Sequence, residues 1–345
     1  MSDALDLRPV TGAWPQLRGG QAQPLTGGTN TVLYRVETEA GAYVLRLVGA
    51  QVTPRRLRFE YDILTRLDAD GLPFALPTPL LTAQGNSFAR VALAGETADE
   101  RGSEALATLT PLIVGQCPQR DDLAQAEGAG EALGLLDEVL ARISPAQPDD
   151  ALTWRSTGDL THCHPFAPEP RAAMGALPLP AEALARLLAD YDTLLRRCAP
   201  IYASLPRQLS HEDVDPSNVL MLGAQVTGIL DWEFCALDLR PMDLVVALSW
   251  WPVERFGSGD EWPIIAALLR GYARHRRLDT AEIAAMPTLF RLRAYSSLIH
   301  RLGRQRQGLS PMAHVILRAE AALAGEDWLQ ANSERLIQLV DEALR

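Results

Sequence analysis

The residues with the clearest chemical potential surround a short hairpin signal in the second half of the chain. Two runs with β-strand character, 218–222 and 226–230, are joined by the turn-forming residues 223–225. Folding this hairpin would bring Asn218, at its start, beside Asp231, just after its end. An amide oxygen and a carboxylate at one end of a hairpin suit Mg²⁺, which prefers hard oxygen ligands and keeps several waters besides. The spacing therefore predicts a magnesium site made by these two residues.

Asp213 lies five residues before Asn218, on the loop that leads into the hairpin. With the metal bound by the other two side chains, its carboxylate would be free to accept a proton from a substrate hydroxyl. The layout H-x-D-x-x-x-x-N followed by a further aspartate is that of phosphoryl transfer in protein-kinase-like enzymes. Asp213 is therefore the candidate catalytic base, and Asn218 and Asp231 are the candidate metal ligands.

This segment resembles the phosphotransferase family that includes aminoglycoside phosphotransferases, choline kinases and type II homoserine kinases. Members of that family read H-G-D-x-x-x-x-N-V-L, followed by I-D-W/F/Y-E. The chain departs from the pattern at Glu212, where a small residue is usual, and at Asp215, where His or Phe is common. Neither change removes a chemical role, although Glu212 adds a charge beside Asp213. The resemblance implies ATP-dependent phosphorylation of a small-molecule hydroxyl, with Mg²⁺ as the metal.

A second pair of charged residues is expected near the nucleotide phosphates. Thr53 followed by Pro54 marks a helix start, and Glu60 falls on the apolar stripe of that helix, where a charge needs a partner. Arg46 sits between two leucines of the run Tyr43-Val44-Leu45-Arg46-Leu47, so it points to the face opposite those leucines. An Arg46–Glu60 ion pair would be the counterpart of the kinase Lys–Glu pair. The alternative is a solvated Glu60.

Lysine is absent, since all 32 basic residues are arginine. A kinase-like enzyme normally holds the α- and β-phosphates with a lysine, so that role would pass to Arg46. Just before the first expected strand lies Thr26-Gly27-Gly28-Thr29-Asn30. By the resemblance this is the nucleotide-covering loop, with Gly27, Gly28 and Asn30 at the phosphates, because glycines let backbone N–H groups approach closely. A plain turn is the alternative.

Composition limits the function classes. The chain has 345 residues, 47% of them hydrophobic, which is enough for two domains or one large bilobal unit. It has no apolar run of roughly 18 residues and no basic, apolar leader at residues 1–6, so we expect neither a membrane helix nor a secretory signal. Four scattered cysteines fit a reducing cytoplasm. The formal charge of −11 argues against a nucleic-acid partner.

The expected fold is α+β and bilobal, protein-kinase-like, with a small antiparallel sheet in an N-lobe and a large, mainly helical C-lobe. We place the lobes at residues 1–115 and 116–345, because the apolar run 105–114 ends at Gly115, where similar sequences have the interlobe hinge. Beyond Asp231 the pattern is helical. Asp243 either caps the helix that follows it or braces the catalytic loop by accepting hydrogen bonds from its backbone.

Other candidate residues are interpreted as structural. His162, Cys163 and His164 lack a second ligand pair at zinc-site spacing, and His211 is expected to orient the catalytic loop. Trp250 and Trp251 are expected in the core or in a pocket wall. The arginines near His300 are interpreted as a solvated helix face; they are Arg301, Arg304 and Arg306.

The predicted activity is therefore that of a small-molecule kinase using ATP and Mg²⁺. A homoserine-like amino acid, an amino sugar and an amino alcohol all remain open as substrates, although Trp250 and Trp251 in sequence with Ser249 resemble the homoserine-kinase-like branch. One rival is a nucleotide-binding regulator or scaffold that has lost catalysis, which the missing lysine favours. Another is a metal-dependent hydrolase built on histidines. The oligomeric state is not predicted.

Overall fold

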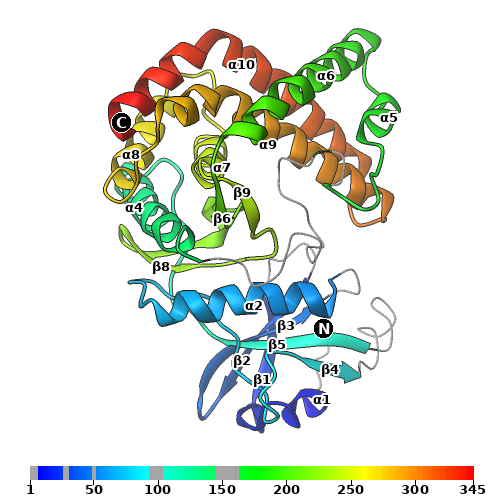
Figure 1. Ribbon diagram of the computed structural model, residues 1–345. Helices are drawn as coiled ribbons and strands as arrows, with labels where there is room; N and C mark the ends of the chain where they lie inside the picture. Colours follow the sequence, from blue (N-terminus) through cyan, green and yellow to red (C-terminus); the bar gives the residue numbers. More distant parts are fainter. Residues whose placement is uncertain (1–6, 26–30, 49–51, 93–103, 144–159, 161–162) are drawn as a thin grey trace. The chain divides into compact units, whose positions relative to one another are not determined.

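The computed structural model describes residues 7–25, 31–48, 52–92, 104–143, 160 and 163–345. The chain divides into two compact units. The first comprises Met1–Gly115, Asp150–Thr153 and Thr227–Leu230; the second comprises Gln116–Asp149, Trp154–Val226 and Asp231–Arg345. Figure 1 shows the elements of each unit. Within the described ranges, none of the helices combines the length and the apolar character that a bilayer crossing requires.

An antiparallel sheet of five strands, in the order β1-β2-β3-β5-β4, forms the first unit (Figure 1). The strands are β1 (Gln21–Leu25), β2 (Thr31–Thr38), β3 (Gly41–Val48), β4 (Ala89–Ala92) and β5 (Glu104–Pro111). The remaining elements of the unit are α1 (Arg8–Thr11), the 3-10 turn η1 (Pro15–Leu17) and α2 (Pro54–Ala69). Gly41 has φ 142° at the β2–β3 turn, a conformation that favours glycine.

The alternation along β3 determines what each face of the sheet contacts. Leu45 and Leu47 are fully buried and join a core cluster with Val10, Trp14 and Leu17 from the preceding segment. Because successive side chains of a strand point to opposite faces, the residue between the two leucines is directed to the other face. The N-terminal segment thus supplies the apolar cover for one side of the sheet.

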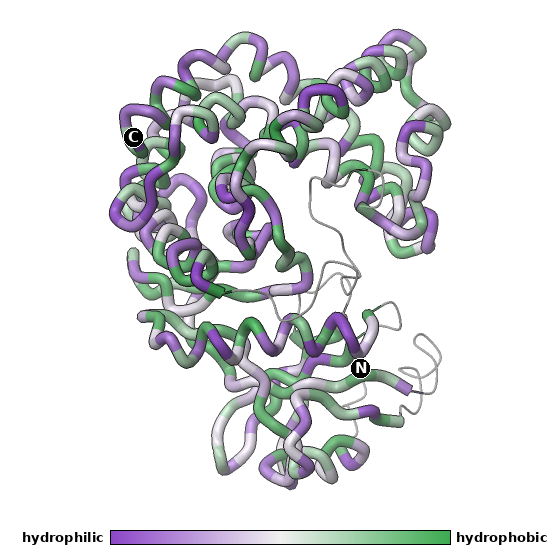
Figure 2. Tube along the Cα trace, in the orientation of Figure 1, coloured by the Kyte–Doolittle hydropathy of each residue, from purple (hydrophilic) through white to green (hydrophobic). Residues whose placement is uncertain are grey.

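Helix α2 begins where the sequence predicts. Thr53 is the N-cap, and its side chain accepts a hydrogen bond from Arg56 N at 3.2 Å. Hydrophobic and hydrophilic segments alternate along this helix in Figure 2, and Leu57, Leu64 and Leu67 on its apolar stripe are completely buried. Glu60 lies on the same side of the helix and is 2% exposed, so the solvated alternative for this residue is wrong.

The second unit is mainly helical, as predicted. Its helices are α4 (Leu123–Leu140), α5 (Pro170–Gly175), α6 (Ala181–Ser204), α7 (Met242–Trp250), α8 (Glu261–Tyr272), α9 (Thr280–Arg306) and α10 (Met312–Leu344). Its short elements are β6 (Arg207–Ser210), the 3-10 turn η3 (Pro216–Asn218), β7 (Val219–Leu222) and β9 (Ala236–Leu239). Strand β8 (Gln225–Ile229) pairs with β7, and β6 pairs antiparallel with β9.

Small residues allow α4 and α8 to pack closely. A Cβ on Gly130 would lie 2.1 Å from the carbonyl oxygen of Leu268, and one on Gly271 would lie 2.0 Å from that of Glu127. No side chain fits at either position without moving the opposite backbone. The two helices run side by side in Figure 1.

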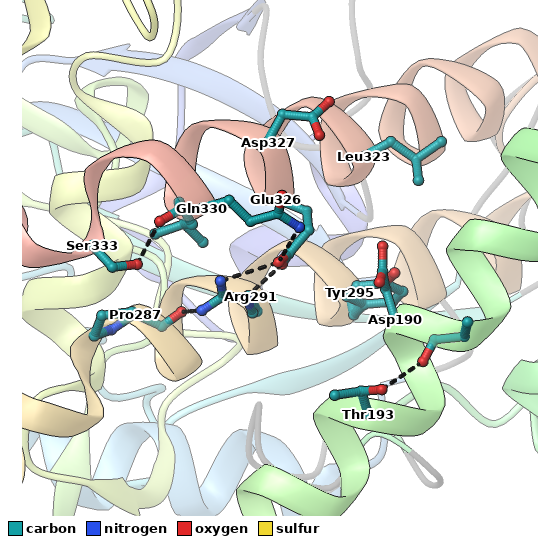
Figure 3. A network of polar contacts seen from close by, with 12 residues as sticks. Asp190, Thr193, Pro287, Arg291, Tyr295, Leu323, Glu326, Asp327, Gln330 and Ser333 are labelled. Carbon is teal, nitrogen blue, oxygen red and sulfur yellow. Dashed lines mark hydrogen bonds and ion pairs between the residues drawn. The ribbon is translucent and has the colours of Figure 1, made fainter.

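An ion pair that is largely shielded from solvent joins α9 to α10 (Figure 3). Arg291 donates from Nη2 to Glu326 Oε1 at 3.1 Å and from Nε to Oε2, and both side chains are 12% exposed. Arg291 also donates to the carbonyl oxygen of Pro287 at 3.0 Å. A bidentate pair of this kind fixes the relative position of two helices as well as adding energy. It therefore sets where the other side chains of α9 point.

Strands β6, β7 and β8 position the catalytic-loop candidates. The loop runs from the end of β6 at Ser210 through η3 into β7, and Gly223 turns the chain into β8 with φ 61°. Met221 exchanges backbone hydrogen bonds with Gln116 at 3.0 and 2.8 Å. The expected hairpin is therefore present, and Asp231 follows its second strand.

Candidate active site

Asp213 is fixed by its own loop. Asn218 donates from Nδ2 to Asp213 Oδ2 and to its carbonyl oxygen, both at 2.9 Å. The backbone N–H of Asp213 donates to His211 Nδ1 at 3.2 Å, and the His211 ring packs edge-on against Trp232 with centroids 4.6 Å apart. The structural interpretation of His211 as an orienting residue agrees with this geometry. One oxygen of Asp213 is engaged by Asn218, and the loop backbone is constrained on both sides.

Asp243 braces the same loop from α7. Its carboxylate accepts hydrogen bonds from the backbone N–H groups of His211 at 2.7 Å and Glu212 at 2.6 Å. The helix itself has Pro241 as its N-cap, and no side chain caps it. Of the two alternatives for Asp243, capping is therefore wrong and bracing is correct. Asp243 lies two residues beyond the N-cap position, inside the first turn, and its side chain accepts from the loop instead.

A buried carboxyl group supports Asp243. Asp137 on α4 is fully buried and accepts a hydrogen bond from the hydroxyl of Tyr272 at 2.6 Å. Burial, followed by the nearby charge of Asp243, raises the pKa of Asp137 well above its ordinary value. Two close carboxylates cannot both ionise cheaply out of water. Asp137 therefore carries the proton of this pair.

Two residues of the site adopt left-handed backbone conformations. Glu212 has φ 64° and Asp231 has φ 58°. This region costs a residue with a Cβ on the order of 1 kcal/mol, and aspartate and asparagine tolerate it better than most. Glycine would adopt this conformation at position 212 without that cost. The loop on both sides of Glu212 is fixed by hydrogen bonds. Asp243 accepts from the N–H groups of His211 and Glu212, and the His211 ring accepts from the N–H of Asp213.

A residue that sequence reasoning missed completes the surroundings of Asp213. Arg293 on α9 donates from Nη2 to Asp213 Oδ1 at 3.0 Å, and the two side chains are 13% and 18% exposed. The partners are 80 residues apart in sequence. Arg293 lies in an ordinary amphipathic helix, so no local pattern marks it. Both oxygens of Asp213 therefore have a donor.

Negative charge is concentrated around Asp213. The pKa of its carboxyl group is raised to about 7, mainly by burial; Arg293 opposes the shift, the charges of Asp231 and Asp215 add to it, and the hydrogen bond from Asn218 opposes it. A carboxylate with a raised pKa is a better proton acceptor near neutral pH than one at its ordinary value.

The donor set fits Mg²⁺. Because Asn218 turns its Nδ2 toward Asp213, its amide oxygen is left as the ligand atom on the other side, and Asp231 adds a carboxylate. Both are the hard oxygens that Mg²⁺ prefers. A divalent cation would also relieve the repulsion between Asp231 and Asp213. The assignment of Asn218 and Asp231 as metal ligands stays a prediction.

The expected ion pair of the first unit is present. Arg46 Nη1 lies 2.8 Å from Glu60 Oε1, with the arginine side chain 15% exposed. Arg46 faces away from the leucine core of β3, and α2 presents Glu60 to that face. The ion pair itself is therefore confirmed, and contact of either residue with nucleotide stays a prediction.

Several other candidate residues remain to be located. Gly27, Gly28, Asn30 and His162 lie outside the described residues. His164 packs against His300 with ring centroids 5.2 Å apart, and burial lowers its pKa to about 4. Within the described ranges, no group of three or more His, Cys, Asp or Glu side chains could hold a metal ion.

The prediction for Trp251 is confirmed, whereas the prediction for the arginines near His300 is wrong in part. Trp251 is 1% exposed and lies in the core, whereas Trp250 is partly exposed. Arg304 is 3% exposed, so interpreting its run as a solvated face is wrong at that position. Arg301 is partly buried and Arg306 is exposed. Helix α9 is covered on more than one side, which periodicity in a long helix does not reveal.

The candidate site, one unit built on an antiparallel sheet and one mainly helical unit together define a protein-kinase-like phosphotransferase. Comparison with known proteins agrees. The model of the phosphotransferase enzyme family matches residues 21–285, so the chain belongs to that family. The homoserine kinase of Allorhizobium ampelinum is 30% identical over 278 residues, covering 80% of this chain and 78% of that protein. The homoserine kinase of Methylocella silvestris is 29% identical over 286 residues, covering 82% and 81%.

Solved structures share the fold at lower identity. A microcompartment-associated aminopropanol kinase superposes with a TM-score of 0.70 at 22% identity, covering 92% of this chain and 95% of that one. An amicoumacin kinase in complex with AMP-PNP has a TM-score of 0.67 at 16% identity, covering 93% and 92%. The predicted protein-kinase-like α+β fold is confirmed. The chain is an ATP-using phosphotransferase that acts on small molecules.

Proposed function

We propose that this phosphotransferase transfers the γ-phosphoryl group of ATP to the hydroxyl of a small hydroxy-amino acid, with homoserine as the first candidate. The observation that carries the proposal is the fixed carboxylate of Asp213, which has Asn218 on one oxygen and Arg293 on the other. Such a group can accept or orient one hydroxyl proton. Homoserine comes first because relatives that cover most of the chain carry that name.

In this proposal positioning and charge neutralisation supply most of the catalysis, because phosphoryl transfer needs little covalent help from the protein. Asp213 orients the acceptor hydroxyl and takes its proton. Asp243 and His211 fix the loop backbone on which Asp213 stands. Arg46, positioned by Glu60, binds the nucleotide phosphates in place of the usual lysine. Mg²⁺, bound by Asn218 and Asp231, would neutralise charge on the phosphates.

The first experiment is a substrate panel. Consumption of ATP would be measured with homoserine, 3-aminopropan-1-ol, choline and an aminoglycoside, each over a range of concentrations. We expect the highest kcat/KM for homoserine. A higher value for choline or the aminoglycoside would contradict the hydroxy-amino acid assignment. Nucleotide binding without turnover on any acceptor would favour the regulator or scaffold instead.

Replacing Arg46 tests how phosphates are held without lysine. We expect Arg46→Lys to retain measurable turnover, because an ammonium group still neutralises phosphate although it loses the bidentate geometry. Arg46→Ala should lose most activity and raise the KM for ATP. Glu60→Ala should resemble Arg46→Ala, because Arg46 would no longer be directed by its partner. Steady-state kinetics with varied ATP distinguish these outcomes.

A control is needed because Glu60 is buried. Removing Arg46 alone leaves an unpaired buried carboxylate, which costs about 3–5 kcal/mol of stability. The double variant Arg46→Ala/Glu60→Gln removes that charge, so its folding can be matched to the parent by thermal denaturation. Full activity in a folded double variant would assign phosphate binding to other groups.

A further inference from the structure

A group of basic and aromatic side chains lies beside Asp213, and the mechanism described above uses only one of its contacts, that of Arg293 with Asp213. It consists of Arg293 and Arg301 on α9, Arg318 on α10 and Trp250 at the end of α7. We refer to it as the arginine–tryptophan cluster. All of its members belong to the second unit, and Arg293 connects it directly to Asp213 through the 3.0 Å ion pair.

Two guanidinium groups share the indole of Trp250. The Cζ atom of Arg293 lies 5.7 Å from the ring centroid, and that of Arg318 lies 4.5 Å from it. Each contact is favourable by itself, because the ring face is negative. Bringing two like charges to one ring is unfavourable, however, and more so where water is partly excluded. The arrangement needs a compensating negative charge.

Through ion pairs, the described residues supply that charge to only one of the three arginines. Within the described part of the chain, Arg318 and Arg301 make no ion pair, and Arg293 pairs only with Asp213. Asp215 is the acidic residue whose charge reaches Arg318, but the two side chains form no ion pair, and Asp215 Oδ1 instead accepts hydrogen bonds from Ser217 N at 2.6 Å and Ser217 Oγ at 2.5 Å. Arg318 and Arg301 therefore lie near the catalytic carboxylate without an ion-pair partner among the described residues.

The electrostatics of Arg318 agree with the geometry. Burial lowers the pKa of its guanidinium, and the charges of Arg301 and Arg293 lower it further. The group nevertheless remains protonated near neutral pH, as arginine does in proteins. A partly buried cation kept among other cations is a binding site for an anion, and a guanidinium matches the planar fork of a carboxylate.

We infer that the arginine–tryptophan cluster binds a carboxylate of the acceptor molecule whose hydroxyl is presented to Asp213. Arg318 is the principal donor, since none of its N–H groups is engaged within the described residues, whereas Arg293 already has one arm on Asp213. The inference rests on the proposed function and adds to it: the acceptor must be anionic at one end. Amino sugars and choline, which bear positive charge and no carboxylate, would be repelled.

The test compares ligands that differ only in the carboxylate. L-2-aminobutyrate is homoserine without its hydroxyl, so it cannot accept a phosphoryl group, and propylamine is its counterpart without the carboxylate. Their dissociation constants would be measured by calorimetry on the full chain. We expect L-2-aminobutyrate to bind on the order of 10- to 100-fold more tightly than propylamine, the range of a charge-assisted hydrogen bond.

Variants test whether the arginine–tryptophan cluster causes this difference in affinity. Arg318→Gln should remove most of the advantage of L-2-aminobutyrate, and Arg318→Lys should restore part of it. Arg335→Gln is the matched control, because Arg335 also lies on α10 and over a tryptophan ring, 4.1 Å from the centroid of Trp262. It should leave both dissociation constants unchanged. Equal binding of the two ligands to the parent, or an unaltered difference in a folded Arg318→Gln, would overturn the inference.

Further measurements distinguish a carboxylate site from a phosphate site, and failure of this inference from failure of the proposed function. If the anion were a nucleotide phosphate, Arg318→Gln would raise the KM for ATP and leave that for homoserine unchanged. Inorganic phosphate that binds more tightly than L-2-aminobutyrate in an Arg318-dependent way would likewise overturn the choice of a carboxylate. Absence of turnover on homoserine, with Arg318-dependent binding of L-2-aminobutyrate, would refute the proposed function and leave the carboxylate site standing.

Discussion

Asp213→Asn should lower kcat by roughly two to four orders of magnitude, the usual contribution of a positioned acid or base, while leaving the affinity for ATP nearly unchanged. The amide is close in size to the carboxylate and can still accept from Asn218 through its oxygen, so the loop should retain its geometry. What is lost is the capacity to take the hydroxyl proton, together with the ion pair to Arg293. Single-turnover kinetics with homoserine, together with calorimetry for ATP, would measure both effects.

Asp121→Asn provides the matched control for this change. Asp121 is an exposed carboxylate in an ion pair with Arg255, so its replacement alters charge equally without touching the catalytic loop. Its kcat should equal that of the parent. Unchanged turnover in Asp213→Asn would remove Asp213 from its assigned role. A drop in ATP affinity equal to the drop in kcat would indicate that the carboxylate acts on the nucleotide instead.

The features that could be predicted from sequence are those whose partners are close in the chain or follow a simple period. Helix α2 begins at Pro54 after its Thr53 cap because both signals are local. The Arg46–Glu60 pair followed from strand alternation and helix periodicity, since each places a charge on a face that would otherwise bury it. The hairpin β7–β8 followed from its turn residues.

Contacts between distant segments could not be predicted in this way. Arg293 reaches Asp213 from another helix, and nothing in its own neighbourhood distinguishes it from a solvated arginine. Asp243 was open between two roles because they depend on where the helix begins, and its N-cap lies two residues earlier, at Pro241. The burial of Arg304 depends on elements that pack against α9 from elsewhere in the chain. Each case required the tertiary arrangement.

The left-handed backbone at Asp231 determines how its proposed metal role should be tested. Alanine at φ 58° would add a conformational cost of about 1–2 kcal/mol, which would mix a folding effect with the loss of a ligand. Asparagine tolerates this conformation and retains the side-chain shape. Asp231→Asn is therefore the better variant, with Asp260→Asn at an exposed position of the second unit as the control.

We expect Asp231→Asn to abolish the Mg²⁺-dependent tightening of ATP binding, so that dissociation constants measured with Mg²⁺ and with EDTA become equal. Turnover should fall by two or more orders of magnitude, because charge neutralisation by a metal ion is worth several kcal/mol in the transition state. The control should keep the full Mg²⁺ dependence of the parent. Asn218→Ala should weaken that dependence less, since an amide contributes a dipole where Asp231 contributes a full charge. An Asp231→Asn variant with the Mg²⁺ dependence of the parent would place the metal on other residues.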